Sequence, residues 1–573
     1  MKRLAIIGLG PRGLYALENL LIELCENDKQ IHIEVFEPND QPGAGQVWNT
    51  NQSNSNWINI TERALSGITK RPEIKYHNIT IESFASYHEW CNFSLDKEEA
   101  DTFPPRNKMG RYLHERFNSL EKGLLKTQLY KRHQQTITTI EPKDKLLKLT
   151  ASKNQVYTFD EVLLTIGHQP TELSDQLNAF ITHANKNENC SVFSEAYPVE
   201  QLNDLKNKQN INIGIRGFGL ASIDVIRYLV KNNFGDFKLK NPVTKKLEYS
   251  ASKDQNLKIV PFSLDGLPLA PKPLNKIIDD WYKPSDSELK NLEKELTFFT
   301  RSEKKVEDLD FLVSPVSKIA TRVYCDLKDK AIDHSFKSKK IYHKISSFLK
   351  HDNYSDVLIQ DESVPTYELM RSYVNMALGT QKTSLDYCVW QVWRHCQPTF
   401  YKVFSYSKLK DEVLKKVIAL DERSKRFSYG PPIESMQQLI ALVDEGILDL
   451  NYTKDPEIKL TENGFLLNNE TQKSIEVSVM INSVLDPPEL LKVNSNIVTD
   501  LLKNDLVKPI HSDLGIETDE NAYVKSKIEN FGTPIAVLGR LAKGSVMGVD
   551  AILECFGDRI ENWAKHCVKN LSD

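Results

Sequence analysis

The sequence predicts an α/β fold that contains two parallel-sheet units and an inserted helical domain. Two observations predict the units: an apolar run, a glycine-rich turn and an amphipathic segment follow one another at residues 4–36 and again at 210–230. A third predicts the helical domain, because residues 276–426 are poor in glycine, rich in lysine and glutamate, and apolar at helical spacing. Since 573 residues are too many for one hydrophobic core, two or three domains are expected.

The first unit begins with an apolar run at residues 4–7 that leads into the turn GLGPRG, residues 8–13. An amphipathic segment follows, and then a second apolar run, residues 31–36, which ends at Glu37. Strand, glycine turn, helix, strand and acid in this order are typical of a βαβ unit that binds a dinucleotide. The sequence therefore predicts a Rossmann-type nucleotide site at this turn.

Each part of this motif has a physical role. Gly8 permits the tight turn, Gly10 lets the backbone approach a pyrophosphate, and Gly13 lets the helix pack closely on the strand. The helix N-terminus supplies N–H donors and a partial positive charge for the phosphates. Glu37 can accept hydrogen bonds from ribose hydroxyls. The strand context and the acid together favour a nucleotide site over an ordinary glycine turn.

Two later segments can bring bare backbone to the same edge of the sheet. Residues 38–48, PNDQPGAGQVW, leave the carboxyl end of the second strand, where α/β sheets bind ligands. Gly45 could lie near a phosphate or a ring and Trp48 could cover an aromatic cofactor, but a plain surface loop fits equally well. Residues 128–165 read as short strands, the last of which runs into Thr165-Ile166-Gly167-His168. An ordinary strand exit is an equally good interpretation of that segment.

A second nucleotide motif lies at residues 210–230. A predicted strand at 210–215 meets Gly217-Phe218-Gly219-Leu220-Ala221-Ser222, which is G-x-G-x-x-S, and a predicted helix follows. Ser222 takes the place of the third glycine and is small enough for close packing. Two such units in one chain indicate two dinucleotides, one held tightly and one exchanging.

The motifs GLGPRGL, TIGHQP and RGFGLASIDV resemble those of the two-dinucleotide flavoproteins. More narrowly, the chain resembles the large bacterial FAD/NAD(P)-binding proteins related to N-hydroxylating flavin monooxygenases. The likeness extends to Ala196-Tyr197-Pro198, FSLDGLP (262–268), Tyr429-Gly430-Pro431-Pro432 and VLGRLAKGSVMGVD (537–550), and is slight between 275 and 425. It implies an α/β fold with two Rossmann-type dinucleotide-binding domains and an inserted helical domain.

The resemblance also implies the cofactors, FAD and NAD(P)H, and the residues near them. FAD would lie against Gly8, Gly10, Pro11, Arg12, Gly13, Glu37, Gly45, Gln46, Trp48, Gly167, His168, Gly539, Arg540 and Ser545. The nicotinamide nucleotide would lie against Gly217, Gly219, Leu220 and Ser222. For His168 we expect a role through its backbone rather than in acid/base catalysis.

The choice between NADH and NADPH stays open at this point. The family usually has Ser-Arg in the segment where this chain has Ser263-Leu264-Asp265. An acid there favours a free ribose 2′-hydroxyl, hence NADH. Lys245 and Lys246 could compensate from a loop.

Domain limits follow from the same patterns. We expect residues 1–185 and 472–573 to form the FAD-binding Rossmann-type domain, 186–275 the NAD(P)-binding Rossmann-type domain, and 276–471 a mainly helical insertion that could serve as a substrate or lid domain. Strand patterns at 476–485 and 534–540 predict the return to the first domain, where a glycine-rich turn precedes a helix from Val549.

Within the insertion, Tyr387, Trp390, Trp393 and His395 invite a substrate-pocket interpretation. An aromatic stripe on a helix is more often part of a core, and we favour that reading. His395 and Cys396 are a weak candidate for a catalytic pair because no third orienting group is visible. The catalytic residues therefore stay unknown.

Composition excludes several other classes. The net charge of -4 gives no general reason to expect nucleic-acid binding. The eight cysteines form no C-x-x-C pair and suggest no metal site, which favours reduced thiols in the cytoplasm. No stretch approaches the roughly 18 apolar residues that span a bilayer. We therefore expect a soluble, cytoplasmic bacterial protein with a small-molecule substrate. Nothing in the sequence indicates its oligomeric state.

These observations predict an FAD-dependent oxidoreductase that uses NAD(P)H as hydride donor. The resemblance favours monooxygenase-like chemistry on a small amine or amino-acid-like substrate. A flavin-linked reductase or dehydrogenase that does not use oxygen is one alternative. A non-catalytic FAD- or NAD-binding scaffold is the other.

Overall fold

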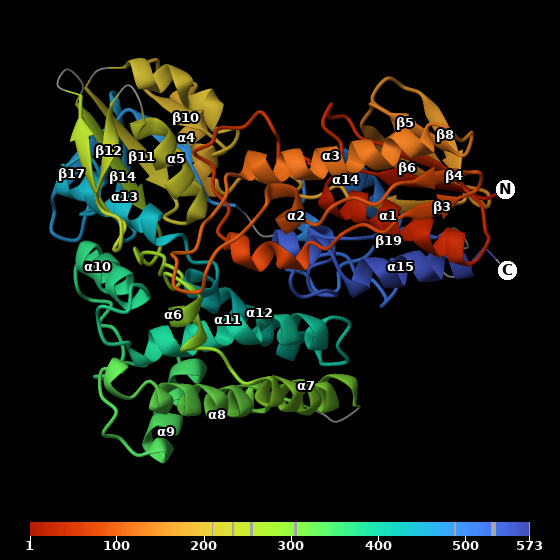
Figure 1. Cartoon of the computed structure of the whole chain (residues 1–573). Helices are drawn as coiled ribbons and strands as arrows, with labels where there is room; N and C mark the ends of the chain where they lie inside the picture. The colour runs from red at the N-terminus through yellow and green to blue at the C-terminus, as the bar shows by residue number, and fades with distance from the viewer. Residues whose placement is uncertain are drawn as a thin grey trace.

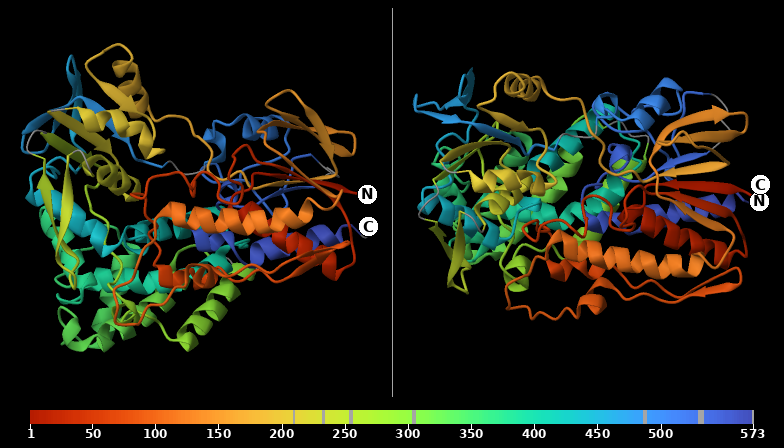
Figure 2. Two further views of the ribbon diagram at one scale, coloured as in Figure 1. Left: turned by 45° about the horizontal axis from the view of Figure 1, so that its top comes forward. Right: turned by 90° about the horizontal axis from the view of Figure 1, so that it is seen from above.

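Two α/β units lie side by side, and a layer of helices runs beneath both of them (Figure 1). This computed structural model describes residues 1–208, 210–231, 234–252, 256–302, 306–485, 489–528 and 534–571. Both chain ends lie on the first unit, close to each other (Figure 2). The predicted α/β class, with two parallel-sheet units and a helical insertion, is confirmed.

The first unit is built on a five-stranded sheet whose neighbouring strands are all parallel. In sheet order the strands are β19 (Ile535–Val537), β9 (Glu161–Leu164), β1 (Arg3–Ile7), β2 (His32–Phe36) and β5 (Tyr130–His133). One face packs against α1 (Pro11–Glu26), α3 (Arg106–Leu124) and α15 (Asp558–Lys569). The other face packs against α14 (Asn496–Lys503) and the antiparallel strands β6 (Ile137–Lys143), β7 (Leu146–Ala151) and β8 (Val156–Phe159). Both faces are buried, as is usual for parallel sheets.

The second unit has a four-stranded parallel sheet. Its strands, in order, are β10 (Ser191–Phe193), β18 (Val479–Asn482), β11 (Ile211–Arg216) and β14 (Leu257–Phe262). The helix α5 (Leu220–Val230) follows β11, and a hairpin of β12 (Gly235–Asn241) and β13 (Lys246–Ala251) precedes β14. The helix α4 (Asp175–Ala184) and the antiparallel strands β15 (Glu457–Thr461), β16 (Gly464–Asn468) and β17 (Ser474–Val477) complete the unit.

Two expectations about the last hundred residues are wrong. The strand predicted at 476–485 was assigned to the first domain, but β18 pairs with β10 and β11 in the second sheet. A short strand buried on both faces fits any parallel sheet, so its pattern cannot tell which sheet it joins. The helix predicted from Val549 begins only at Asp558, after the short turn Ile552–Cys555.

The insertion consists of helices in the described part of residues 276–444. It does not extend to residue 471 as predicted, because β15 and β16 pack on the second sheet. The helices are α6 (Lys276–Asp280), α7 (Asp286–Arg301), α8 (Asp310–Asp326), α9 (Ser338–Lys350), α10 (Thr366–Ala377), α11 (Leu385–Phe404), α12 (Asp411–Ser428) and α13 (Ile433–Asp444). The aromatic stripe on α11 is core, as predicted: Trp390 is 2% exposed and Trp393 is fully buried. Three short elements precede α3 in the chain, namely β3 (Ile74–Tyr76), β4 (Ile79–Ile81) and α2 (Tyr87–Cys91).

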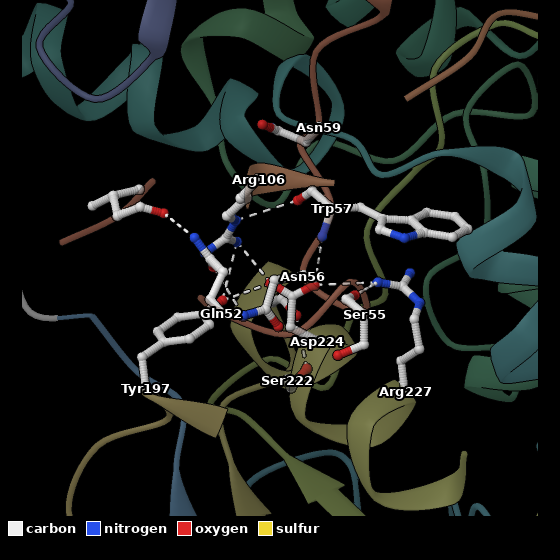
Figure 3. Close-up of polar contacts among 12 residues, drawn as sticks. Gln52, Ser55, Asn56, Trp57, Asn59, Arg106, Tyr197, Ser222, Asp224 and Arg227 are labelled. Atoms are coloured by element: carbon white, nitrogen blue, oxygen red, sulfur yellow. Dashed lines mark hydrogen bonds and ion pairs between the residues drawn. The ribbon is translucent and has the colours of Figure 1, made fainter. Parts of the chain in front are cut away.

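One buried carboxylate joins the two units (Figure 3). Asp224 on α5 accepts a hydrogen bond from Arg106, at the start of α3, at 2.7 Å, and lies 3.2 Å from Arg227. Tyr197 donates to the same carboxylate at 2.7 Å. Arg227 also donates to the carbonyl of Ser55 at 2.6 Å. The network therefore ties α5 of the second unit to α3 and to the 52–57 loop of the first.

The Asp224→Asn variant should loosen this joint. It would leave two buried guanidinium groups without their shared carboxylate, and breaking a buried ion pair in this way costs about 3–5 kcal/mol. We expect a lower denaturation midpoint and faster limited proteolysis between the units. Asp329→Asn makes the same change at a side chain that is 96% exposed and should have no effect. Equal stability of the two variants would contradict the role given to Asp224.

Candidate functional site

Each sheet has a glycine turn at its carboxyl edge, directly before a helix. Gly10 precedes α1 and Gly219 precedes α5. In the described chain neither helix has a capping side chain at its N-terminus, and neither has an acid in its first turn. No described side chain therefore occupies the positive N-terminal end of either helix. The first N–H groups of both helices are left for a phosphate. Both turns fit the pyrophosphate of a dinucleotide.

A hydroxyl from the neighbouring parallel strand supports each turn. Thr165, which follows β9, donates to the carbonyl of Gly8 at 2.5 Å. Ser483, which follows β18, donates to the carbonyls of Arg216 and Gly217 at 3.0 and 3.3 Å. The two units thus share one construction. Ser483 was not among the predicted site residues, because the strand predicted at 476–485 was expected in the first sheet.

Close contacts require glycine at positions 8 and 13 of the first turn. A Cβ at Gly13 would lie 2.5 Å from the carbonyl oxygen of Gly8, so helix and strand pack as predicted. Gly45 lies against Gly10, because a Cβ there would be 3.2 Å from the Gly10 Cα. Pro11 occupies the first position of α1, where its missing N–H costs nothing. The structure thus brings the 38–48 loop to the glycine turn.

Glu37 lies beneath this turn and is 4% exposed. One carboxylate oxygen accepts from the Leu9 N–H at 2.7 Å, and the other accepts from the Asn39 backbone and side chain at 2.9 and 2.7 Å. A carboxylate has about four acceptor positions. Glu37 therefore holds the turn itself and keeps acceptor capacity for one further donor, such as a ribose hydroxyl.

The C-terminal return reaches the same edge. Arg12 donates to the carbonyl of Val549 at 2.6 Å, and a Cβ at Gly539 would lie 3.0 Å from the Arg12 side chain. Arg540 is half-buried, 3.7 Å from Asp550. The structure therefore brings Gly539 and Arg540 to the first turn.

Ser545 is placed differently. Its hydroxyl accepts from the N–H of Thr518 at 2.9 Å and donates to the carbonyl of Ile516 at 3.1 Å. It lines a cavity of about 460 Å³ together with Tyr406, Thr518 and Asp519. The residues of the first glycine turn are not among those that line this cavity. Ser545 therefore stabilises the C-terminal segment itself rather than the first glycine turn.

The remaining predicted residues lie at the two edges with different exposure. Gly167 has a φ of +68°, and no described atom lies within 4 Å of a Cβ built there. His168 and Gln46 are exposed and Trp48 is half-buried. In the second turn Leu220 begins α5, and the Ser222 hydroxyl donates to the carbonyl of Gly219 at 2.7 Å.

Helix α3 supports the loop that carries Gly45 and Trp48, which the sequence analysis did not predict. A Cβ at Gly110 would lie 1.7 Å from the Trp48 carbonyl oxygen, so only glycine fits there. His114 bonds to the carbonyl of Pro42 at 2.9 Å. A glycine inside an otherwise helical pattern was the available signal.

A third group of polar residues lies where the insertion meets both units. Lys272 is 8% exposed and donates to the carbonyl of Asn59. Burial and the nearby Arg394 guanidinium lower the pKa of Lys272 to about 7, although Asp279 opposes them. Asp279 is bound by Arg394 and lies 3.5 Å from His395. His395 is therefore positioned by Asp279 rather than paired with Cys396.

The Gly110→Ala variant should displace the 43–48 loop from α3. Overpacking of this kind costs about 1–3 kcal/mol, and the shifted loop should also weaken FAD binding. Asn118→Ala is the matched control, because this exposed residue lies on the same helix. Titration of FAD into the apo-proteins measures the effect. Unchanged FAD affinity in Gly110→Ala would contradict the supporting role of α3.

Lys272 should make stability depend on pH. Between about pH 7 and the free-lysine value near 10.4, the unfolded chain holds a proton that the folded protein has lost, so rising pH stabilises the fold. Below pH 7 the full cost of burying the charge is present, on the order of 5 kcal/mol. The gain in unfolding free energy of Lys272→Met over wild type should therefore be larger at pH 6 than at pH 9.

Urea denaturation at both pH values tests this dependence. Lys75→Met, at a side chain that is 74% exposed, is the control and should show the same difference from wild type at both pH values. A stability difference between Lys272→Met and wild type that does not change with pH would show that burial does not lower the pKa of Lys272.

Comparisons with known proteins bear on the first turn most directly. A protein-family model described as FAD-NAD(P)-binding matches residues 5–169. Nitrosuccinic acid synthase of Aspergillus oryzae is 25% identical over 239 residues, which cover 41% of this chain and 36% of that protein. A nitrosuccinate-forming L-aspartate N-monooxygenase of Streptomyces davaonensis is 26% identical over 265 residues, 40% of this chain and 39% of that protein. The matches thus span less than two fifths of either relative.

Two solved structures are also similar. L-lysine 6-monooxygenase from Pseudomonas syringae aligns over 99% of both chains with a TM-score of 0.47 and 10% identity. OTEMO in complex with FAD and NADP aligns over 95% of this chain and 81% of its own, with a TM-score of 0.41 and 11% identity. The comparisons confirm the predicted resemblance to proteins related to N-hydroxylating flavin monooxygenases. Residues 5–169 are thus similar in sequence to an FAD-NAD(P)-binding family.

Proposed function

We propose that this chain is an FAD-dependent oxidoreductase that takes hydride from NAD(P)H and oxygenates a small amine or amino-acid-like substrate. The observation that carries the proposal is the pair of uncapped helix N-termini, at Gly10 and Gly219, each at the carboxyl edge of its own parallel sheet. A shared buried network around Asp224 fixes the two units to each other. Such an arrangement suits two nucleotides that must meet.

The residues divide between the two nucleotides. FAD would lie against the first turn and the segments packed on it, including Gly45 and Gly539. The nicotinamide nucleotide would lie against Gly217–Ser222. When bound, FAD supplies the redox chemistry by accepting hydride and passing electrons to an acceptor. The chain's own part is to bind, to orient and to exclude water, which agrees with the lack of an evident nucleophile in the sequence.

Oxygenation of an amine is supported by the two relatives, one named as an L-aspartate N-monooxygenase and one as a nitrosuccinic acid synthase. The insertion supports it as well, because Asn59 of the first unit contacts Tyr429 of the insertion and Lys272 in the segment that leads into it. Such contacts would close the site from water. The absence of C-x-x-C in the sequence disfavours a dithiol reductase.

Two alternatives remain distinguishable by experiment. A flavin reductase or dehydrogenase that does not oxygenate its substrate would oxidise NAD(P)H to NAD(P)+ in air and reduce oxygen only to hydrogen peroxide, whichever candidate amine is added. A scaffold that binds without turnover would be colourless, or would stay yellow when NAD(P)H is added without oxygen.

The cellular setting is also a proposal. We propose a bacterial enzyme of the cytoplasm that acts on a small molecule. In the described part of the chain, no helix combines the length and the apolar character that crossing a membrane requires.

Two valine substitutions test the assignment of the turns. The Cβ at Gly10 would lie 3.8 Å from its nearest neighbour, and no described atom lies within 4 Å of one at Gly219. Both backbones have ordinary negative φ, so the fold should tolerate the changes. Gly10→Val should purify without flavin. Gly219→Val should stay yellow but lose at least a hundredfold in the rate of anaerobic reduction by NAD(P)H.

The absorption spectrum and stopped-flow reduction are the measurements, with thermal unfolding to confirm that each variant is folded. Flavin retained in Gly10→Val would sink the first assignment. Hydride transfer that survives in Gly219→Val would sink the second.

A further inference from the structure

An inserted hairpin in the second unit changes the sequence spacing between the glycine turn and the ribose-binding position, so that the usual spacing does not locate this position. In a nucleotide-binding βαβ unit, the residue after the second strand contacts the adenosine ribose, about 20 residues beyond the glycine turn. Here β14 is that strand, because it pairs with β11 in parallel from Ile211–Leu257 to Arg216–Phe262. The hairpin β12–β13 lies between α5 and β14 and roughly doubles this spacing. The loop 263–266 therefore takes the ribose position.

This loop is held rigidly. The Ser263 N–H donates to the Thr453 carbonyl, and the Asp455 N–H donates to the Ser263 carbonyl, both at 2.8 Å. A Cβ at Gly266 would lie 2.8 Å from the Cα of Lys454. Asp265 is exposed, and one of its carboxylate oxygens accepts from the Leu267 N–H and the Ser263 hydroxyl at 3.1 Å. The carboxylate is thus fixed at the end of the strand.

The charges around the loop are mainly negative. Asp265 and Asp455 are both exposed, and the ammonium group of Lys454 lies 3.7 Å from the carboxylate of Glu470. Glu470 thus offsets the charge of Lys454, while Asp265 and Asp455 add two exposed carboxylates to the paired segments 263–266 and 453–455. A phosphate monoester carries about -1.5 to -2 charges at pH 7. This local charge disfavours the 2′-phosphate of NADPH and leaves a free 2′-hydroxyl as the better ligand.

The lysines that could have compensated are held elsewhere. Lys245 and Lys246 lie at the turn of the inserted hairpin, where the Thr244 carbonyl accepts from Gln437 of α13 at 3.0 Å. The loop after β14 is bound instead to residues 453–455 and to Thr366, whose hydroxyl donates to the Gly266 carbonyl at 3.3 Å.

We propose that the nicotinamide nucleotide of this chain is NADH, and that the carboxylate of Asp265 accepts a hydrogen bond from its adenosine ribose 2′-hydroxyl. This inference rests on the proposed function, because it names the cosubstrate of the second turn. Asp265 thereby acts as the residue that selects between the two nucleotides.

The test removes the charge of Asp265 and leaves the conformation of the 263–266 loop unchanged. In Asp265→Asn the amide oxygen can still accept from the Leu267 N–H, so only the charge is lost. Asp361→Asn is the matched control: one oxygen of this exposed carboxylate accepts from the Ser363 N–H at 2.9 Å and from its hydroxyl at 2.6 Å, in a loop of the insertion. Calorimetric titration with NAD+ and NADP+ gives affinities, and anaerobic flavin reduction by NADH and NADPH gives rates.

We expect the wild-type protein to prefer the NAD form at least tenfold in both measurements. Asp265→Asn should reduce this preference at least fivefold, and Asp361→Asn should leave it unchanged. Adding Leu264→Arg to Asp265→Asn should reverse the preference, because Leu264 is 85% exposed and loses no packing when replaced.

Two results would overturn the inference: a wild-type preference for the NADP form, and a preference for the NAD form that Asp265→Asn does not change. Loss of a preference for the NADP form when Lys245 and Lys246 become alanine would assign that preference to the two lysines. Failure of the proposed function is distinct, because then neither nucleotide would bind or reduce the flavin at all.

Discussion

The arrangement of the molecule depends on one buried carboxylate. Asp224 lies between two guanidinium groups, one from each unit, and each of the three would be costly to bury alone. Burial opposes the charge of Arg106, but Tyr197 and Asp224 raise the pKa of Arg106 above its ordinary value. For Arg227 the effect of burial outweighs the attraction of Asp224, and its pKa is lowered. Because Asp224 is on the first turns of α5, the same ion pairs that join the units also fix the helix N-terminus at which a nucleotide would bind.

This constraint matters because hydride transfer requires reacting atoms within about 3–3.5 Å of each other. The phosphate ends of two nucleotides would be set by Gly10 and Gly219, which belong to different sheets. Their distance is therefore decided by how the units dock and not by either turn alone. The insertion and the segment before it add a second link, since Tyr429 and Lys272 both contact Asn59 of the first unit. A change at these contacts can alter reactivity without touching a cofactor.

Much of this could be predicted from the sequence, for a physical reason. The two glycine turns and Glu37 are local patterns, in which strand, turn and helix follow within some forty residues. Three features could not be predicted because they depend on distant partners. The strand β18 joins the second sheet although its pattern suits either. Gly110 is required by a carbonyl of another segment, and Ser483 supports a glycine turn that precedes it by more than 260 residues.

The two units share one construction but differ at the ribose position, and this difference bears on how long each nucleotide stays bound. In the first unit Glu37 is 4% exposed and already holds the glycine turn, so a ribose bound there would be covered by the 38–48 loop. In the second unit Asp265 stands exposed on a rigid loop with the exposed Leu264 beside it. A ligand that reaches an exposed carboxylate can leave without moving the protein. The first site therefore suits a resident flavin nucleotide, and the second suits a cosubstrate that exchanges at every turnover.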